Sequence, residues 1–261
     1  MTDLSYREKQ DRLNARIRAH KLFANFDIDE WIDQFLGLRP RRRILDLACG
    51  NGNHLGLYLK HVGRDGTVAG IDREPSLIAE ARTSYPDAPN LDLRVGTMDE
   101  RLPFADASFD LCFSNFAIYN AADPAFTLRE LKRVMELGAE LVLIGPTMNN
   151  AREIYEFNER LTGQAIDPIT LVRTDRLRQE ILPVVREVFG GAREEVINSR
   201  LTFPDQDEFI RYYTSTMLYE EGAEKLGYTE EQMRAACSSA RDIVLSKEML
   251  AVLASRDGNE P

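Results

Sequence analysis

Short apolar runs alternate with stretches of helical spacing through the middle of the chain. Apolar residues at every third or fourth position indicate a helix, and short continuous apolar runs indicate buried strands. Their alternation is typical of a parallel sheet with helices on both faces. It predicts an α/β, doubly wound fold whose ligand crevice lies at the carboxyl ends of the strands. We expect strands at 44–48, 67–71, 91–95, 110–114 and 140–145, and helices at 53–62, 76–84 and 124–136.

The two ends of the chain depart from this alternation. Residues 5–36 have helical spacing, with Leu13, Ile17 and His20 on one face. Pro40 ends that segment, because a proline disfavours helical geometry in the residue before it. Towards the C-terminus we expect helices at 151–161, 174–189, 205–219 and 229–244, a strand at 194–203, and a closing antiparallel strand at 246–254, where a helix also fits.

The first predicted strand runs into a glycine loop and then into a helix, an arrangement that lets a backbone close around a ligand. Gly50 and Gly52 remove side chains where a ligand must approach the main chain or where a positive φ is needed. Asp46 places a carboxylate under that loop. Phosphate-binding proteins use glycine loops too, but a carboxylate at this point favours a ligand that carries a positive charge.

A second carboxylate, Asp72, ends the next predicted strand, about twenty positions beyond the glycines. An acid at that spacing accepts hydrogen bonds from the two hydroxyls of a ribose. Dinucleotide-binding proteins share this feature, so a nicotinamide oxidoreductase is one alternative. Their pyrophosphate loop needs G-x-G-x-x-G, and the third glycine would fall at position 55. This chain has Leu55 there, which argues against a pyrophosphate ligand.

The segment 44–59 resembles the first motif of class I S-adenosylmethionine-dependent methyltransferases. Other segments between residues 40 and 147 resemble later parts of that family, in the family's order and with ordinary spacing. Two positions depart from the family: Ala48 stands where many members have glycine, and Ala139 replaces the second glycine of a common pair. The other matching segments are 68–72, 96–99, 102–110, 114–117, 128–135 and 141–144.

The resemblance implies S-adenosylmethionine as the cofactor and a Rossmann-like methyltransferase fold with a mostly parallel, seven-stranded sheet. It implies an N-terminal helical lid at residues 1–39 and a cofactor-binding α/β core at residues 40–147. Residues 148–261 would form a helical, substrate-binding insertion after strand five together with the closing strands. The residues that we expect to contact the cofactor are Asp46, Ala48, Gly50, Gly52, Asp72, Arg73, Met98, Asp99 and Asn115.

Individual roles follow from the same resemblance. Asp72 would accept the ribose hydroxyls, Asp99 would meet the adenine amino group, and Asn115 would lie beside the methionine end. Met98 is either a contact with the adenine face or simple core packing. Arg73 either lies along the adenine or is simply an exposed arginine at the start of a helix. Asp99 could also be an acidic residue in an ordinary turn, without a role in binding.

The sequence shows no arrangement of nucleophile, base and acid, which agrees with direct methyl displacement and leaves the catalytic residues unassigned. Tyr119 is a weak candidate that could orient a substrate or act as a base, and a packing role fits it equally well. His20, together with Tyr6, could close over the cofactor from the N-terminal segment, although ordinary helix packing also explains both. A pocket lining or a plain core would explain the aromatic residues Phe209, Tyr212, Tyr213 and Tyr219.

The acidic balance of the chain limits its partners. With 43 acidic and 33 basic residues, the formal charge of −10 disfavours nucleic acid, whose phosphates need a basic surface. The segment from Asn115 to Ile118 also lacks the N-P-P-Y type tetrapeptide of nucleic-acid amino-methylating enzymes. We therefore expect a small-molecule methyl acceptor, with secondary metabolites as one class, methylated at O, N or C. A cofactor-binding, non-catalytic regulator or scaffold is the alternative.

Cysteine and histidine usage argues against a metal site. The three cysteines and three histidines show no spacing typical of metal ligands, and Cys49 and Cys112 suit small buried thiols in a reducing compartment. The chain has no apolar run of about 18 residues and no apolar signal-peptide core. We therefore expect no membrane span and a cytoplasmic location. The sequence leaves the oligomeric state open, a homodimer being one option.

Overall fold

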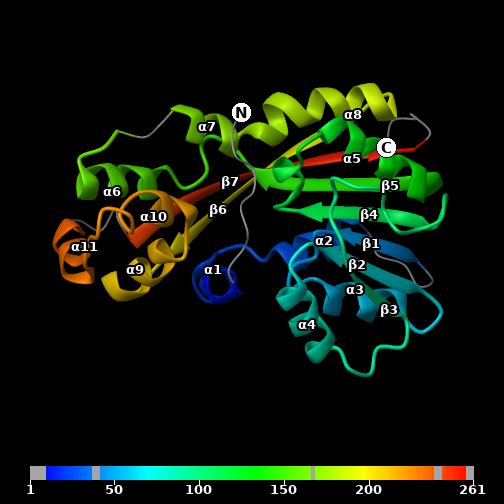
Figure 1. The fold of residues 1–261 in the computed structure, drawn as a ribbon, viewed down its shortest axis with the longest axis horizontal. Coiled ribbons are helices and arrows are strands. Elements are labelled where there is room, and N and C mark those ends of the chain that lie inside the picture. The colour runs from blue at the N-terminus through cyan, green and yellow to red at the C-terminus, as the bar shows by residue number, and fades with distance from the viewer. Residues whose placement is uncertain (1–9, 37–41, 166–167, 238–242, 257–261) are drawn as a thin grey trace.

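The computed structural model of the protein describes residues 10–36, 42–165, 168–237 and 243–256. Its centre is a seven-stranded sheet in the order β3-β2-β1-β4-β5-β7-β6 (Figure 1). The strands β1 to β5 pair in parallel, and β7 is antiparallel to both of its neighbours. The strands are β1 (Arg43–Leu47), β2 (Thr67–Asp72), β3 (Leu91–Val95), β4 (Phe109–Asn115), β5 (Met135–Pro146), β6 (Arg193–Thr202) and β7 (Val244–Ser255).

The strand order reverses between β1 and β4, and a doubly wound sheet opens its ligand crevice at such a point. The predicted doubly wound, mostly parallel sheet of seven strands is therefore confirmed. The closing segment, for which the sequence also allowed a helix, is the antiparallel strand β7, where Leu253 pairs with Val142 of β5.

Successive residues of β1 face opposite sides of the sheet. Because both sides carry apolar residues, helices cover both faces of the sheet. Ile44 belongs to the apolar cluster on one face, and its neighbour Leu45 belongs to the cluster on the other face. Figure 1 shows these two layers on opposite sides of the sheet. The first face carries α2 (Ile28–Leu36), α3 (Leu55–Val62) and α4 (Pro75–Ser84); the second carries α5 (Pro124–Val134), the π-helix η2 (Leu177–Ile181) and α8 (Leu182–Phe189).

A third apolar cluster lies around one end of β6 and β7, away from the first three strands (Figure 1). Phe157, Phe209 and Tyr213 are fully or almost fully buried in it, with ring centroids about 5 Å apart in edge-on pairs. The helices around it are α1 (Gln10–Phe23), α6 (Arg152–Thr162), α9 (Gln206–Thr214), α10 (Met217–Glu221) and α11 (Glu230–Ala236). Two further short helices are η1 (Ile118–Asn120) and α7 (Pro168–Thr174).

Several predicted helices have different limits in the structure. The helix expected at 124–136 ends at Val134, because the chain from Met135 onwards pairs with β4. The helix expected at 205–219 is two helices, since Thr216 accepts a hydrogen bond from the Tyr219 N–H and starts α10 anew. The helix expected at 174–189 is η2 followed by α8, and α7 precedes it.

The helix expected at 229–244 begins where the sequence predicts, but it does not extend to Val244. Its described part is α11, which starts in a capping box built on Thr229 and Gln232. Val244 is not helical, because it begins β7 and pairs with Thr202 of β6. The rest of that expected helix falls at 238–242, outside the described residues.

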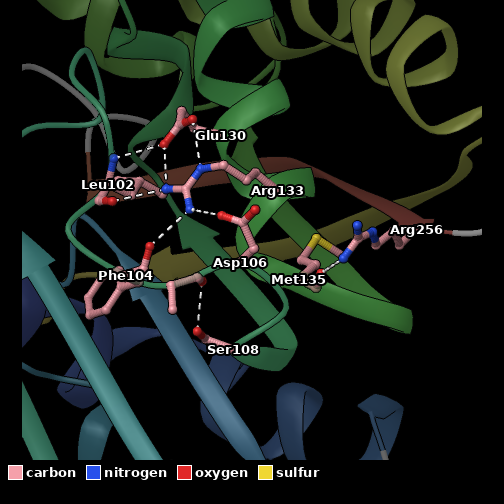
Figure 2. A network of polar contacts seen from close by, with 9 residues as sticks. Leu102, Phe104, Asp106, Ser108, Glu130, Arg133, Met135 and Arg256 are labelled. Atoms are coloured by element: carbon pink, nitrogen blue, oxygen red, sulfur yellow. Dashed lines mark hydrogen bonds and ion pairs between the residues drawn. The ribbon is translucent and has the colours of Figure 1, made fainter.

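One arginine holds the loop before β4 against α5 (Figure 2). The Arg133 guanidinium donates to the carbonyl oxygens of Leu102 at 3.0 Å and Phe104 at 2.9 Å. It also pairs with Glu130 and Asp106, each at 2.7 Å. Glu130 in turn accepts the Leu102 N–H at 2.9 Å. The pKa of Glu130 is lowered, and the largest cause is its hydrogen bond with Arg133.

Candidate functional site

A cavity of about 240 Å³ opens where β1, β2 and β4 end, beside the loop that follows β3. All of the residues predicted to contact a cofactor lie on its wall except Gly52. Segments from four separate strand ends therefore meet at one place, as expected for the crevice of a doubly wound sheet. The predicted residues on the wall are Asp46, Ala48, Gly50, Asp72, Arg73, Met98, Asp99 and Asn115.

The loop after β1 is held by backbone hydrogen bonds to β2. The N–H groups of Ala48 and Cys49 both donate to the carbonyl of Ile71, at 2.7 and 3.1 Å. Ala48 (φ 64°) and Gly50 (φ 56°) adopt left-handed geometry, which turns the chain tightly around the cavity. Gly52 lies behind the loop, where an added Cβ would come within 2.8 Å of Leu55. Gly52 has a positive φ of 82° and allows close packing of the loop, and it does not line the described cavity wall.

Asp72 links β2 to this loop. Its carboxylate accepts the Gly50 N–H at 2.8 Å through one oxygen and the Glu74 N–H at 2.9 Å through the other. Burial raises the pKa of Asp72, and the two backbone hydrogen bonds oppose that rise. Each carboxylate oxygen has more than one acceptor position, so Asp72 can still accept hydrogen bonds from a ligand.

Asp46 and Asn115 present buried oxygens without protein partners. Asp46 is 2% exposed, and neither its Oδ2 nor Asn115 Oδ1 has a hydrogen-bond partner among the described residues. Asn115 is held in place because its Nδ2 donates to the Tyr58 hydroxyl at 3.2 Å, and Tyr58 stacks on Phe113. Burial raises the pKa of Asp46 to about 7. A cation in the cavity would satisfy both oxygens and favour the ionised carboxylate.

The loop after β3 forms a second side of the cavity. Met98 is partly buried, and its carbonyl accepts a hydrogen bond from the Thr127 hydroxyl at 3.0 Å. Asp99 is exposed and accepts the Ala122 N–H at 2.7 Å, which ties this loop to the segment after β4. Arg73 lies on the wall with an exposed side chain.

Helix α1 closes another side of the cavity through Leu13 and Ile17. Polar contacts fasten this helix to the glycine loop and to α4. The Asn51 amide donates to Asn14 Oδ1 at 2.7 Å and to Glu80 Oε1 at 3.3 Å, and Asn14 also contacts Glu80. An N-terminal segment, a loop and a helix that are far apart in sequence thus share one polar network beside the cavity.

The two weak catalytic candidates, Tyr119 and His20, are absent from the cavity wall formed by the described residues. The Tyr119 ring packs next to Gly145, and its carbonyl accepts a hydrogen bond from Arg176 at 2.7 Å. The His20 ring lies 6.1 Å from the Tyr212 ring, centroid to centroid, and burial lowers its pKa to about 3. Tyr6, the other residue considered with His20, lies outside the described residues.

The site residues expected from the sequence do not include His54, which lies on the wall. His54 lies at the start of α3, and its Nδ1 is 2.5 Å from Asp29 Oδ1 of α2. Phe116 also lies on the wall, in a left-handed conformation with φ 54°. A non-glycine residue in this conformation is strained, and such residues cluster at functional sites.

The described wall residues fit a cofactor with a nucleoside and a cationic end. Asp72 offers acceptors for ribose hydroxyls, and the partnerless oxygens of Asp46 and Asn115 suit an ammonium or sulfonium group. A carboxylate under the loop does not suit a pyrophosphate. Fold and cavity together define a Rossmann-like protein that binds a nucleoside-bearing cofactor with a cationic end.

Comparison with known proteins finds a domain match and several relatives. Residues 45–143 match the family model described as a methyltransferase domain. A demethylmenaquinone methyltransferase from Staphylococcus aureus is 26% identical over 214 residues, which cover 79% of this chain and 78% of that protein. An uncharacterized 37.1 kDa protein in a transposon of Streptomyces fradiae is 35% identical over 137 residues. That match covers 51% of this chain and 39% of the relative, so it spans well under half of the relative's length.

Solved structures show the same fold. A SAM-dependent methyltransferase from Aquifex aeolicus superimposes with a TM-score of 0.54 at 21% identity, covering 72% of this chain and 93% of that one. A geranyl diphosphate C-methyltransferase from Streptomyces coelicolor, solved with S-adenosylhomocysteine, superimposes with a TM-score of 0.53 at 17% identity. The match covers 87% of this chain and 76% of that one. Residues 45–143 thus match a methyltransferase domain, and the chain has the fold of solved S-adenosylmethionine-dependent methyltransferases, an enzyme class whose cofactor is S-adenosylmethionine.

In residues 10–36, 42–165, 168–237 and 243–256, no cluster of three histidine, cysteine or acidic side chains is arranged to hold a metal ion. Within the same residues, none of the helices is both long and apolar enough to cross a membrane.

Proposed function

We propose that this chain transfers the methyl group of S-adenosylmethionine to an oxygen, nitrogen or carbon atom of a small molecule, with secondary metabolites as one acceptor class. One observation carries the proposal: at the point where the strand order reverses, Asp46 and Asn115 hold buried oxygens that have no hydrogen-bond partner among the described residues. A protein that only needed a stable fold would gain by pairing or removing such groups, because burying them unpaired is costly.

We assign the cofactor contacts as follows. Asp46 Oδ2 and Asn115 Oδ1 accept hydrogen bonds from the ammonium of the methionyl end, and Asp72 accepts from the ribose. The loop with Met98 and Asp99 faces the adenine, with Arg73 beside it. Ala48 and Gly50 shape the turn that brings the backbone close to the cofactor, and Gly52 supports that turn from behind.

We place the acceptor beside Asn115, where Phe116, Ala117 and Asn120 line the cavity. The bound cofactor supplies an electrophilic methyl group on a sulfonium, whose charge disappears as the methyl group leaves. The chain then acts mainly by positioning, and correct placement of two reactants can provide about 7–11 kcal/mol of the barrier reduction. A general base is needed only when the acceptor atom must lose a proton.

The acidic charge of −10 supports a small molecule rather than nucleic acid as the acceptor. Two similar proteins point the same way: one is a demethylmenaquinone methyltransferase and the other a geranyl diphosphate C-methyltransferase. We propose that residues 1–39 act as a lid, that 40–147 hold the cofactor, and that 148–261 build the acceptor side. A cytoplasmic location and a homodimer remain part of this proposal.

A methyl-transfer screen tests the proposal. Purified protein is incubated with methyl-labelled S-adenosylmethionine and panels of hydroxylated aromatics, amines and carboxylic acids. We expect label in members of one panel, and we expect calorimetry to detect binding of S-adenosylmethionine but not of NADH. Asp46→Asn should abolish transfer, whereas Asp92→Asn, an exposed change on β3, should leave it intact. Tight cofactor binding without transfer to any panel would favour the regulator or scaffold instead.

A further inference from the structure

His54 lies on the cavity wall and is oriented by a residue from another helix. Its Nδ1 is 2.5 Å from Asp29 Oδ1, which lies in the first turn of α2. An ionised carboxylate can only accept a hydrogen bond, so the hydrogen on Nδ1 points to Asp29. The other ring nitrogen, Nε2, is left for a different partner. The His54 side chain is 15% exposed, so such a partner would be largely shielded from bulk water.

The surroundings of His54 place it on the side of the cavity where Asp46 and Asn115 lie. Its ring is 6.5 Å from the Tyr58 ring, and the Tyr58 hydroxyl holds Asn115. His54 is also close enough to Asp46 to oppose the rise in the pKa of that carboxyl. The imidazole therefore lies near the Asp46 carboxyl and near the tyrosine that holds Asn115, the two residues that we assign to an ammonium group.

An amino acid end is a zwitterion, so a site that holds its ammonium must also accommodate its carboxylate. Asp46 and Asn115 offer acceptors for the positive half. His54, which also lines the cavity, can serve the negative half, because an imidazole that carries hydrogens on both ring nitrogens donates from both.

We propose that His54, held by Asp29, binds the α-carboxylate of the cofactor's methionyl end, while Asp46 and Asn115 bind its α-ammonium. Asp29 is a positioning residue in this arrangement, because it acts through His54. The inference rests on the proposed function in that it deepens the same cofactor site. It predicts that the chain distinguishes ligands that possess this carboxylate from ligands that lack it.

The chain contains a matched control for this pair. His61 Nε2 lies 2.9 Å from Asp33 Oδ1, so a second histidine–aspartate pair joins the same two helices, α3 and α2. Unlike His54, His61 does not line the described cavity wall. If the pairs serve only to fasten α2 to α3, replacing either histidine should have the same effect on ligand binding.

The test is calorimetric binding of three ligands to the full chain and its variants. S-adenosylhomocysteine has both the ammonium and the carboxylate, decarboxylated S-adenosylmethionine keeps only the ammonium, and 5′-methylthioadenosine has neither. We expect His54→Ala to weaken S-adenosylhomocysteine roughly tenfold to a hundredfold, as for a lost hydrogen bond to a charged group. Binding of the other two ligands should stay within about twofold of the wild type, and His61→Ala should bind all three normally.

Other outcomes overturn the inference. An equal loss for all three ligands would make His54 a support of the loop. A loss shared by S-adenosylhomocysteine and decarboxylated S-adenosylmethionine would place His54 at the ammonium. Retained binding of 5′-methylthioadenosine shows that a variant is folded. If His54→Ala fails to fold, Asp29→Asn takes its place and should show the same ligand preference with a smaller loss.

These results are independent of methyl transfer. Failure to find an acceptor would leave the binding comparison intact. If the wild type bound none of the three ligands, the proposed function itself would fail.

Discussion

The carboxylate of Asp72 accepts the backbone N–H of Gly50 at 2.8 Å, so the acid that ends β2 fixes the glycine loop that follows β1. One side chain thus has two tasks in our assignment: it shapes the loop, and it meets the ribose. The second carboxylate oxygen is fixed by the Glu74 N–H at 2.9 Å, which sets the orientation of the group.

Asp72→Ala should weaken S-adenosylmethionine binding by about 1.5–3 kcal/mol, because hydrogen bonds to a charged acceptor are lost and the loop loses its tie. Calorimetry with the wild type and the variant measures the change. Asp87→Ala, an exposed aspartate in the turn before β3, is the matched control and should bind normally. An unchanged affinity in Asp72→Ala would refute the ribose assignment.

Asp46→Asn should make the ligand-free protein more stable at pH 8, although it impairs cofactor binding. Burial raises the pKa of Asp46 to about 7, well above the ordinary aspartate value. The folded state therefore binds a proton at Asp46 more tightly than the unfolded state does. Protonation of Asp46 thus stabilises the fold at low pH, and this stabilisation is lost as pH rises from about 4 through about 7. Asparagine does not titrate, so the advantage of the variant should grow across that window.

Chemical denaturation of both proteins at pH 5 and pH 8 measures this difference. We expect the stability gap in favour of Asp46→Asn to be larger at pH 8 by on the order of a few kcal/mol. An equal difference in stability at the two pH values would contradict the raised pKa of Asp46. In the wild type, S-adenosylmethionine affinity should fall below pH 7, because its ammonium needs the ionised carboxylate.

Much of this site follows from the sequence because its parts lie at strand ends. The apolar runs predict where β1, β2 and β4 stop, and Asp46, Asp72 and Asn115 mark those ends. In a doubly wound sheet such positions meet at one edge whatever the loops between them do.

The pairing of His54 with Asp29 could not be predicted in the same way. The two residues lie on different helices, and no local spacing connects them. Their contact depends on how α2 packs against α3, which is a tertiary event. For the same reason periodicity grouped His20 with Leu13 and Ile17, although only the latter two reach the cavity. Long-range strand pairing likewise places Val244 in β7, where local spacing predicted a helix.

Arg133→Met should destabilise the fold without touching cofactor contacts. The variant leaves the Leu102 and Phe104 carbonyls and the Glu130 carboxylate without their shared donor (Figure 2). Several broken hydrogen bonds to a charged group should cost about 2–4 kcal/mol of unfolding free energy. Urea denaturation measures this cost, and Arg129→Met, an exposed change on the same helix, should cost less than about 0.5 kcal/mol. Equal losses in the two variants would show that the Arg133 network contributes little.

Phe116 permits a test that separates backbone strain from acceptor binding. Its φ of 54° is costly for any residue with a Cβ, while glycine adopts it freely. Phe116→Ala and Phe116→Gly remove the same ring, which is 38% exposed and therefore contributes little to the core. We expect the glycine variant to be more stable than the alanine variant by about 1 kcal/mol, reversing the usual order of these residues.

Both Phe116 variants should bind S-adenosylhomocysteine as the wild type does, because our assignment places Phe116 on the acceptor side of Asn115. Once the screen identifies an acceptor, its KM should rise in both variants, while the KM for S-adenosylmethionine changes little. Steady-state kinetics with each substrate varied in turn measures the two constants. A rise confined to S-adenosylmethionine would move Phe116 to the cofactor and leave the acceptor side to Ala117, Asn120 and the neighbouring helices.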